Sequence, residues 1–110
     1  MKTILTITGS DSSGISGVQA DIRTIASLGA YAVSAITSIT MQNTIGIQSF
    51  YDLPAATVRG QVEAVVIDVE PQVVKIGMIR RTDVPQVIVD LIVKYKPHFV
   101  VYDSILRSAN

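Results

Sequence analysis

Short aliphatic runs alternate along this chain with segments in which apolar residues recur every three or four positions. This alternation restricts the possible folds more than any other feature. The extended segments are predicted at Ile4–Thr8, Tyr31–Ser34 with Ala35–Met41, Ile47–Tyr51, Val73–Ile76 and Phe99–Tyr102. A helical pattern follows the first, the third and the fourth of these segments. Such an order is typical of an α/β fold with a mostly parallel sheet, and 110 residues suit one domain.

The predicted helices are amphipathic, and their apolar stripes indicate which face is buried. In the first helix, Val18, Ile22 and Ile25 are expected to form the stripe that packs on the sheet. A valine-rich second helix must depend on packing, because valine has a weak intrinsic helix propensity. The third helix is the most regular, and Thr82 or Asp83 is expected to cap its start.

The composition excludes several classes of protein. Hydrophobic residues make up 48% of the chain and aromatic residues only 5%, which indicates an aliphatic core. Nine basic residues balance nine acidic ones without a basic block, which argues against nucleic-acid binding. The absence of cysteine excludes a disulfide framework and a thiolate metal site. The first apolar run is too short for a signal peptide, and no run reaches the ~18 residues of a membrane span. We therefore expect a cytoplasmic protein without a membrane partner.

Polar and flexible residues follow the predicted strands. In an open α/β sheet, ligands bind in the crevice outside the carboxyl ends of the strands, so these residues are expected to converge on one small-molecule site. They are Gly9, Ser10 and Asp11; Gln42, Asn43 and Thr44; Lys75, Gly77 and Met78; and Asp103 and Ser104.

The glycine-rich stretch after the first strand does not have the pattern of a nucleotide loop. Gly9-Ser-Asp-Ser-Ser-Gly14 has the outer spacing of a phosphate loop, but Ile15 stands where that loop carries lysine. A dinucleotide fingerprint fails as well, because Ser12 occupies the position of its second glycine. The glycines are more consistent with a backbone that lies close to a flat ligand.

Four single residues allow more than one interpretation. Asp21 lies in the first turns of a helix, where a carboxylate has either a structural or a functional role. Lys75 lies in an apolar strand and is expected to pair with an anion or a nearby aspartate. Met78 taken alone is more consistent with the core, and His98 has no partner at a spacing that suggests a site.

Five motifs in order resemble the N-terminal part of the hydroxymethylpyrimidine and phosphomethylpyrimidine kinases, which have a three-layer ribokinase-like α/β fold. The segment Thr-Ile-Thr-Gly-Ser-Asp-Ser-Ser-Gly-Ile-Ser-Gly-Val-Gln-Ala-Asp, from Thr6 to Asp21, resembles the family pattern AGSDSGGGAGIQAD. The other matches are Leu28-Gly-Ala-Tyr31 with LGVYG, Ile36 to Gly46 with ITALTAQNTxGV, Val74-Lys-Ile-Gly-Met78 with VKIGM, and Val100-Val-Tyr-Asp103 with the strand that ends in Asp.

The resemblance implies transfer of the γ-phosphoryl group of ATP, with Mg²⁺, to a hydroxymethylpyrimidine and then to its monophosphate in thiamine biosynthesis. The substrate-binding residues it implies are Gly9, Asp21, Gln42, Met78 and Ile105, with Lys75 and Asp103 in support. A carboxylate and a carboxamide can read the donor and acceptor edge of an aminopyrimidine, and apolar side chains can supply flat walls.

The chain departs from the family pattern in ways that leave its activity open. Ile15 and Ser16 replace small residues in the loop, Ser104 replaces a proline, and Arg107 adds a charge near the pocket. The resemblance covers residues 1–110 as the substrate-binding part, and the family's catalytic aspartate, anion hole and nucleotide site lie in a C-terminal part. We therefore expect these 110 residues alone not to act as a kinase. The alternatives are a pyridoxal kinase of the same superfamily and a non-catalytic pyrimidine-binding module. A homodimer is expected by analogy.

Overall fold

The computed structural model describes residues 1–103, which form five strands and three helices. In chain order they are β1 (Thr3–Asp11), α1 (Gly17–Ser27), β2 (Tyr31–Gln42), β3 (Ile47–Asp52), α2 (Ala55–Val69), β4 (Val73–Ile76), α3 (Val84–Tyr95) and β5 (Phe99–Tyr102). This is the predicted order. The two extended segments predicted between residues 31 and 41 form one continuous strand, β2.

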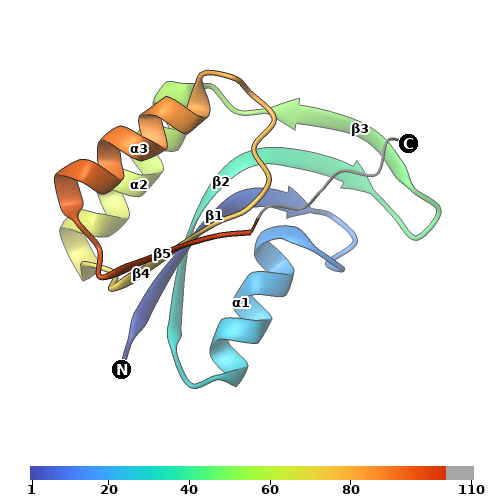
Figure 1. The fold of residues 1–110 in the computed structure, drawn as a ribbon. Coiled ribbons are helices and arrows are strands. Elements are labelled where there is room, and N and C mark those ends of the chain that lie inside the picture. The colour runs from blue at the N-terminus through green and yellow to red at the C-terminus, as the bar shows by residue number, and fades with distance from the viewer. Residues whose placement is uncertain (104–110) are drawn as a thin grey trace.

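The strands form a single sheet in the order β3-β2-β1-β4-β5 (Figure 1). All neighbouring pairs are parallel except β2 and β3, which form an antiparallel hairpin. From β1 the chain continues through α1 to β2 on one side, whereas from β4 it continues through α3 to β5 on the other. The carboxyl ends of β1 and β4 therefore flank a topological switch point, which is where ligands bind in such sheets.

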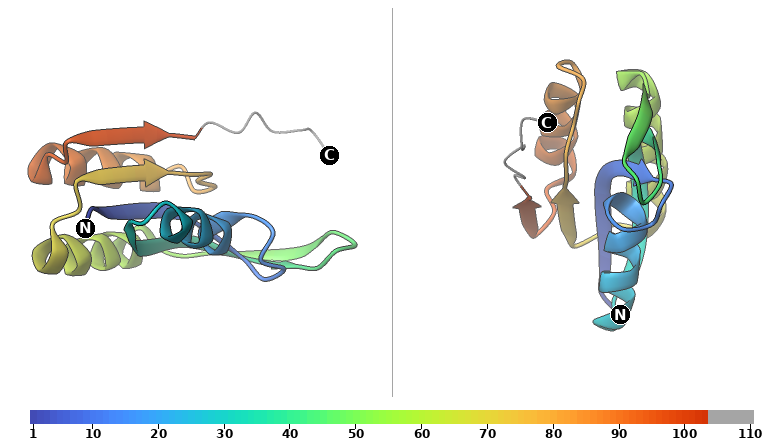
Figure 2. Two further views of the ribbon diagram at one scale, coloured as in Figure 1. Left: turned by 90° about the horizontal axis from the view of Figure 1, so that it is seen from below. Right: turned by 90° about the vertical axis from the view of Figure 1, so that its right-hand side faces the viewer.

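The helices cover both faces of the sheet and make three layers. Helix α1 lies on one face, and α2 and α3 lie side by side on the other (Figures 1 and 2). The main apolar core lies between the sheet and the α2/α3 layer. Its fully buried members include Leu5, Ile7, Val58, Val84 and Leu91. Because side chains alternate along a strand, Thr6 and Thr8 of β1 belong to the opposite face from Leu5 and Ile7.

Two local predictions were wrong in their details. Ile22 is 40% exposed, whereas Val18 and Ile25 are buried. The position between them on the sheet-facing side of α1 is occupied by Asp21, whose carboxylate reaches the strands. Asp83 does occupy the N-cap position of α3, but its side chain makes no capping hydrogen bond and instead pairs with Arg81.

The two edges of the sheet are β3 and β5. All four residues of β5 are exposed, since this strand pairs with β4 only. Within residues 1–103, no helix is both long enough and apolar enough to cross a membrane.

Candidate functional site

A cavity of about 450 Å³ lies at the carboxyl ends of the strands. It brings together six of the residues that the sequence singled out for binding: Gly9, Asp21, Gln42, Lys75, Met78 and Asp103. They come from β1, α1, β2, β4 and the segments that follow β4 and β5, so the predicted convergence of these segments is confirmed. Ile105, Ser104 and Arg107 lie outside the described residues.

Asp21 is held in a fixed position by two partners from neighbouring strands. Thr6 and Lys75 lie beside each other in the register of β1 and β4. The hydroxyl of Thr6 donates to Asp21 Oδ2 at 2.6 Å, and the ammonium of Lys75 donates to Asp21 Oδ1 at 2.7 Å. The Asp21 side chain is only 15% exposed. A carboxylate has about four acceptor positions, so two hydrogen bonds orient Asp21 and leave acceptor capacity toward the cavity.

Lys75 is shared between two carboxylates. Its Nζ lies 2.7 Å from Asp21 Oδ1 and 3.5 Å from Asp103 Oδ2. Burial by itself lowers the pKa of Lys75, but the hydrogen bonds and charges of Asp21 and Asp103 outweigh this effect and raise the pKa above its ordinary value. Lys75 is therefore a cation throughout the neutral range, and its predicted role as the partner of a nearby aspartate is confirmed.

The loop between β1 and α1 is organised around the buried carboxylate of Asp11. Its Oδ1 accepts hydrogen bonds from the N–H and hydroxyl of Ser13, and its Oδ2 accepts the corresponding pair from Ser16. Burial alone would raise the pKa of Asp11, but these four donors outweigh it and lower the pKa to about 2. Asp11 lines the cavity, yet its oxygens are occupied by the loop, which indicates a structural role.

Two glycines allow the backbone segments around the cavity to approach closely. Gly17 has a φ of 68°, and a Cβ there would lie 2.5 Å from the carbonyl oxygen of Gly9. A Cβ on Gly77 would collide with the side chain of Thr8, and the Gly77 N–H donates to the Ile7 carbonyl at 2.8 Å. Any larger residue at Gly77 would push the following residue, Met78, away from β1.

Gln42 is held through its backbone, which leaves its side chain available. The hydroxyl of Ser12 accepts from the Gln42 N–H at 2.7 Å and donates to the Gln42 carbonyl at 2.5 Å. Among the described residues, the Gln42 carboxamide has no hydrogen-bonding partner. Asn43 behaves differently, because its carboxamide oxygen accepts from the N–H groups of Ile45 and Gly46 and closes the turn. Of Gln42, Asn43 and Thr44, only Gln42 lines the cavity.

Sequence reasoning missed the residues that β3 contributes to the cavity. Ile47 and Phe50 of β3 line the cavity, and the Arg80 guanidinium lies 3.6 Å from the centre of the Phe50 ring. The sequence patterns placed Ile47 and Phe50 in a predicted strand and gave neither residue a binding role. No local pattern marks them, because their place depends on how the hairpin pairs with the rest of the sheet.

Within residues 1–103, no group of three His, Cys, Asp or Glu side chains could hold a metal ion. Ile15, which takes the place of a phosphate-loop lysine, lines the cavity as an exposed apolar side chain.

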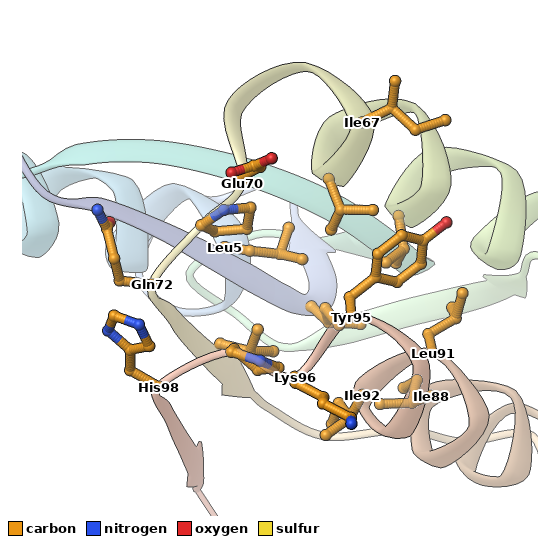
Figure 3. Close-up of a pocket in the computed structure, with 16 residues that line it drawn as sticks. Leu5, Ile67, Glu70, Gln72, Ile88, Leu91, Ile92, Tyr95, Lys96 and His98 are labelled. Atoms are coloured by element: carbon orange, nitrogen blue, oxygen red, sulfur yellow. The ribbon is translucent and has the colours of Figure 1, made fainter.

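A second cavity, of about 530 Å³, lies between α2 and α3 near the amino ends of the strands (Figure 3). Its floor consists of core side chains such as Leu5, Ile88 and Leu91, and Glu70, Lys96 and His98 lie at its rim. None of the predicted binding residues lines it. It is larger, and Glu70, Gln72, Lys96 and His98 are among its lining residues, but it holds none of the residues that the family motifs single out, so the carboxyl-end cavity is the candidate site.

Comparison with known proteins agrees with this geometry. Residues 11–110 match the family described as phosphomethylpyrimidine kinase. The hydroxymethylpyrimidine/phosphomethylpyrimidine kinase of Escherichia coli (strain K12) is 40% identical over 110 residues, which cover 98% of this chain and 41% of that protein.

Solved structures show the same relationship. The phosphomethylpyrimidine kinase of Clostridium difficile 630 superimposes with a TM-score of 0.94 at 42% identity, over 99% of this chain and 47% of that one. The pyridoxal kinase of Staphylococcus aureus, in complex with AMP-PCP and pyridoxal, has a TM-score of 0.86 at 26% identity, over 96% of this chain and 40% of that one.

The chain thus spans less than half the length of each of these proteins. Its fold is ribokinase-like, as the resemblance implied. Together with the match over residues 11–110, these findings show that the chain belongs to the phosphomethylpyrimidine kinase family.

Proposed function

We propose that this chain forms the substrate-binding part of an ATP-dependent kinase for hydroxymethylpyrimidine and its monophosphate in thiamine biosynthesis. The observation that carries the proposal is the carboxyl-end cavity, which gathers Gly9, Asp21, Gln42 and Met78 as the family resemblance implies. A related protein of Oryza sativa is described as a probable thiamine biosynthetic bifunctional enzyme, which agrees with this pathway.

Each of these residues has a distinct proposed role. Asp21, fixed by Thr6 and Lys75, accepts hydrogen bonds from the amino edge of the pyrimidine. The Gln42 carboxamide, which has no hydrogen-bonding partner within residues 1–103, pairs with a ring nitrogen or with the group next to it on the ring. Met78 gives the ring an apolar wall. Gly9 lets the ring lie against the backbone of β1. Ile105 keeps its proposed place in the same pocket by resemblance only.

Phosphoryl transfer is proposed for the whole protein of which this chain is the matching part. ATP use is supported by the related pyridoxal kinases, whose structures hold AMP-PCP or ADP. In this proposal the described residues bind and orient the substrate, and within residues 1–103 no group of three His, Cys, Asp or Glu side chains could hold a metal ion. A cytoplasmic location and a homodimer belong to the same proposal, and light scattering after size-exclusion chromatography tests the dimer.

Pyridoxal kinase is the second candidate, because pyridoxal kinases superimpose with TM-scores between 0.86 and 0.89. Their identity to this chain is 25–28%, against 42% for the phosphomethylpyrimidine kinase of C. difficile. The Gln42-Asn43-Thr44 run and the VKIGM motif also favour the pyrimidine substrate.

The test is a calorimetric titration of the 110-residue chain with hydroxymethylpyrimidine and, in parallel, with pyridoxal. We expect the pyrimidine to bind more tightly, and we expect Asp21→Asn to weaken it about tenfold because one charged hydrogen bond is lost. Tighter binding of pyridoxal would favour the second candidate, and binding of neither would contradict both. An assay of the whole protein with ATP and Mg²⁺ then separates a kinase from a non-catalytic binding module.

A further inference from the structure

Two walls of the candidate site come from parts of the fold that the sheet does not join directly. Phe50 belongs to β3, and Met78 follows β4. Two strands, β2 and β1, lie between β3 and β4 in the sheet. Backbone pairing therefore connects the hairpin wall to the β4 wall only through β2 and β1.

Arg80 connects these two walls. It lies two residues after Met78, and its guanidinium carbon lies 3.6 Å from the centre of the Phe50 ring. Its Nε donates to Asp52 Oδ1 at 2.8 Å. A guanidinium group can stack on a ring and donate to a carboxylate at the same time, because it is planar and carries several donors. Arg80 thus holds β3 through both Phe50 and Asp52.

The neighbouring residue Arg81 shows that this arrangement is particular to Arg80. Arg81 pairs with Asp83 at 2.7 Å, two residues further along the chain, and both side chains face solvent. Neither arginine lines the cavity, but only Arg80 stacks on Phe50 and donates to Asp52 of β3. Arg80 therefore contacts β3, whereas Arg81 pairs with a residue in its own loop.

We propose that Arg80 and Phe50 determine the substrate specificity of the carboxyl-end cavity. Arg80 fixes the Phe50 ring as an aromatic wall, and the slot that Phe50 shares with Met78 admits a flat six-membered heteroaromatic ring with small substituents. This inference rests on the proposed pyrimidine-binding function. A fixed slot disfavours a ring with more or larger substituents, such as the pyridine of pyridoxal, which carries an aldehyde and a phenolic hydroxyl as well as its hydroxymethyl group.

Release of Phe50 is expected to change selectivity more than stability. In the Arg80→Gln variant the stacking partner of Phe50 is lost, so the wall can move outward. Hydroxymethylpyrimidine then binds more weakly, pyridoxal binds equally well or better, and the ratio of the two affinities falls about tenfold, within the range that pocket contacts of this kind give. Arg80→Lys keeps the positive charge but not the planar stacking, so an intermediate ratio is expected.

The experiment measures the dissociation constants of both ligands by calorimetry for the wild type, Arg80→Gln, Arg80→Lys and Phe50→Leu. Arg81→Gln is the matched control, and it is expected to keep the wild-type ratio. The thermal midpoint of each variant is recorded, since a purely structural role would lower it without changing the ratio. Phe50→Leu gives a second, independent measurement if Arg80→Gln folds poorly.

The outcomes separate the two proposals. If the wild type prefers hydroxymethylpyrimidine and both Arg80→Gln and Phe50→Leu keep that preference, the specificity role is wrong and the proposed function stands. If the wild type binds neither ligand, the proposed function fails and the specificity role fails with it.

Discussion

The two ends of the sheet carry cavities of similar size but different chemistry. The carboxyl-end cavity measures about 450 Å³ and the amino-end cavity about 530 Å³. At the carboxyl end, charged side chains are held in place by hydrogen bonds and ion pairs, as Asp21 is by Thr6 and Lys75. At the amino end, the floor consists of Leu5, Ile88 and Leu91, which are the same side chains that form the core. The volumes of the two cavities therefore do not identify the site, whereas the family-motif residues Asp21, Gln42 and Met78, all at the carboxyl end, do.

The largest expected effect is on stability, and it comes from the amino-end cavity. Leu91→Ala removes a buried side chain that packs between α3 and the sheet, so unfolding should become easier by about 2–5 kcal/mol. Because Leu91 lies away from the candidate site, the folded variant should bind hydroxymethylpyrimidine as the wild type does. Urea unfolding and calorimetry measure the two quantities. A loss of affinity without a loss of stability would show that the amino-end cavity belongs to the binding site.

The second effect is the pH dependence of the loop that frames the carboxyl-end cavity. The pKa of Asp11 is lowered from 3.8 to about 2 in the folded chain, so the unfolded chain binds the proton more readily. The ionised Asp11 carboxylate therefore stabilises the folded chain by about 2 kcal/mol. This contribution is complete at pH values above the pKa of Asp11 in the unfolded chain, and it is lost as the pH falls through the pKa of Asp11 in the folded chain. Chemical unfolding at pH values from 5 to about 2 should show this loss in the wild type. Asp11→Asn should be less stable than the wild type at neutral pH and should lose less stability in acid. If the unfolding free energy of both proteins falls equally with pH, Asp11 is not the group responsible.

The third effect concerns Gln42 and tests whether the free carboxamide serves a ligand. Gln42→Leu leaves the polar edge of the pyrimidine unpaired and should weaken its binding by about 1–3 kcal/mol. The thermal midpoint should change little, because the hydrogen bonds of Gln42 to Ser12 involve only its backbone. Asn43→Ala is the matched control, with the opposite expectation: a less stable turn and a small effect on affinity. Wild-type affinity in Gln42→Leu would make Gln42 a turn residue.

The smallest effect is the coupling between Lys75 and Asp21. A double-mutant cycle with Lys75→Met and Asp21→Asn should give a coupling of about 0.5–3 kcal/mol in unfolding free energy, because the two side chains are in direct contact. The value should lie toward the lower end, since Lys75 is 28% exposed and also contacts Asp103. Additive effects in the cycle would mean that Thr6 alone positions Asp21.

Sequence patterns predicted most of the fold. The bounds of β4 and β5 agree with the prediction residue for residue, because a short aliphatic run between turn signals is a local feature. The pairing of Lys75 with an aspartate could also be predicted, since a lysine within a strand needs a partner. The position of Ile22 could not, because Val18-Ile22-Ile25 and Val18-Asp21-Ile25 are both plausible stripes on a helix. Only the contacts with Thr6 and Lys75 place Asp21 on the inner face.

The sequence by itself determined the alternation of strands and helices, the loops that meet at the carboxyl end, and the motifs that identify the family. These features depend on residues near one another in the chain. The tertiary structure alone decided that Phe50 and Arg80 meet beside the site, and that the Asn43 side chain closes the turn instead of lining the cavity. The first outcome depends on how a hairpin at the sheet edge lies against a loop about thirty residues away in the chain, and side-chain periodicity, which repeats within a few residues, carries no information about such a contact.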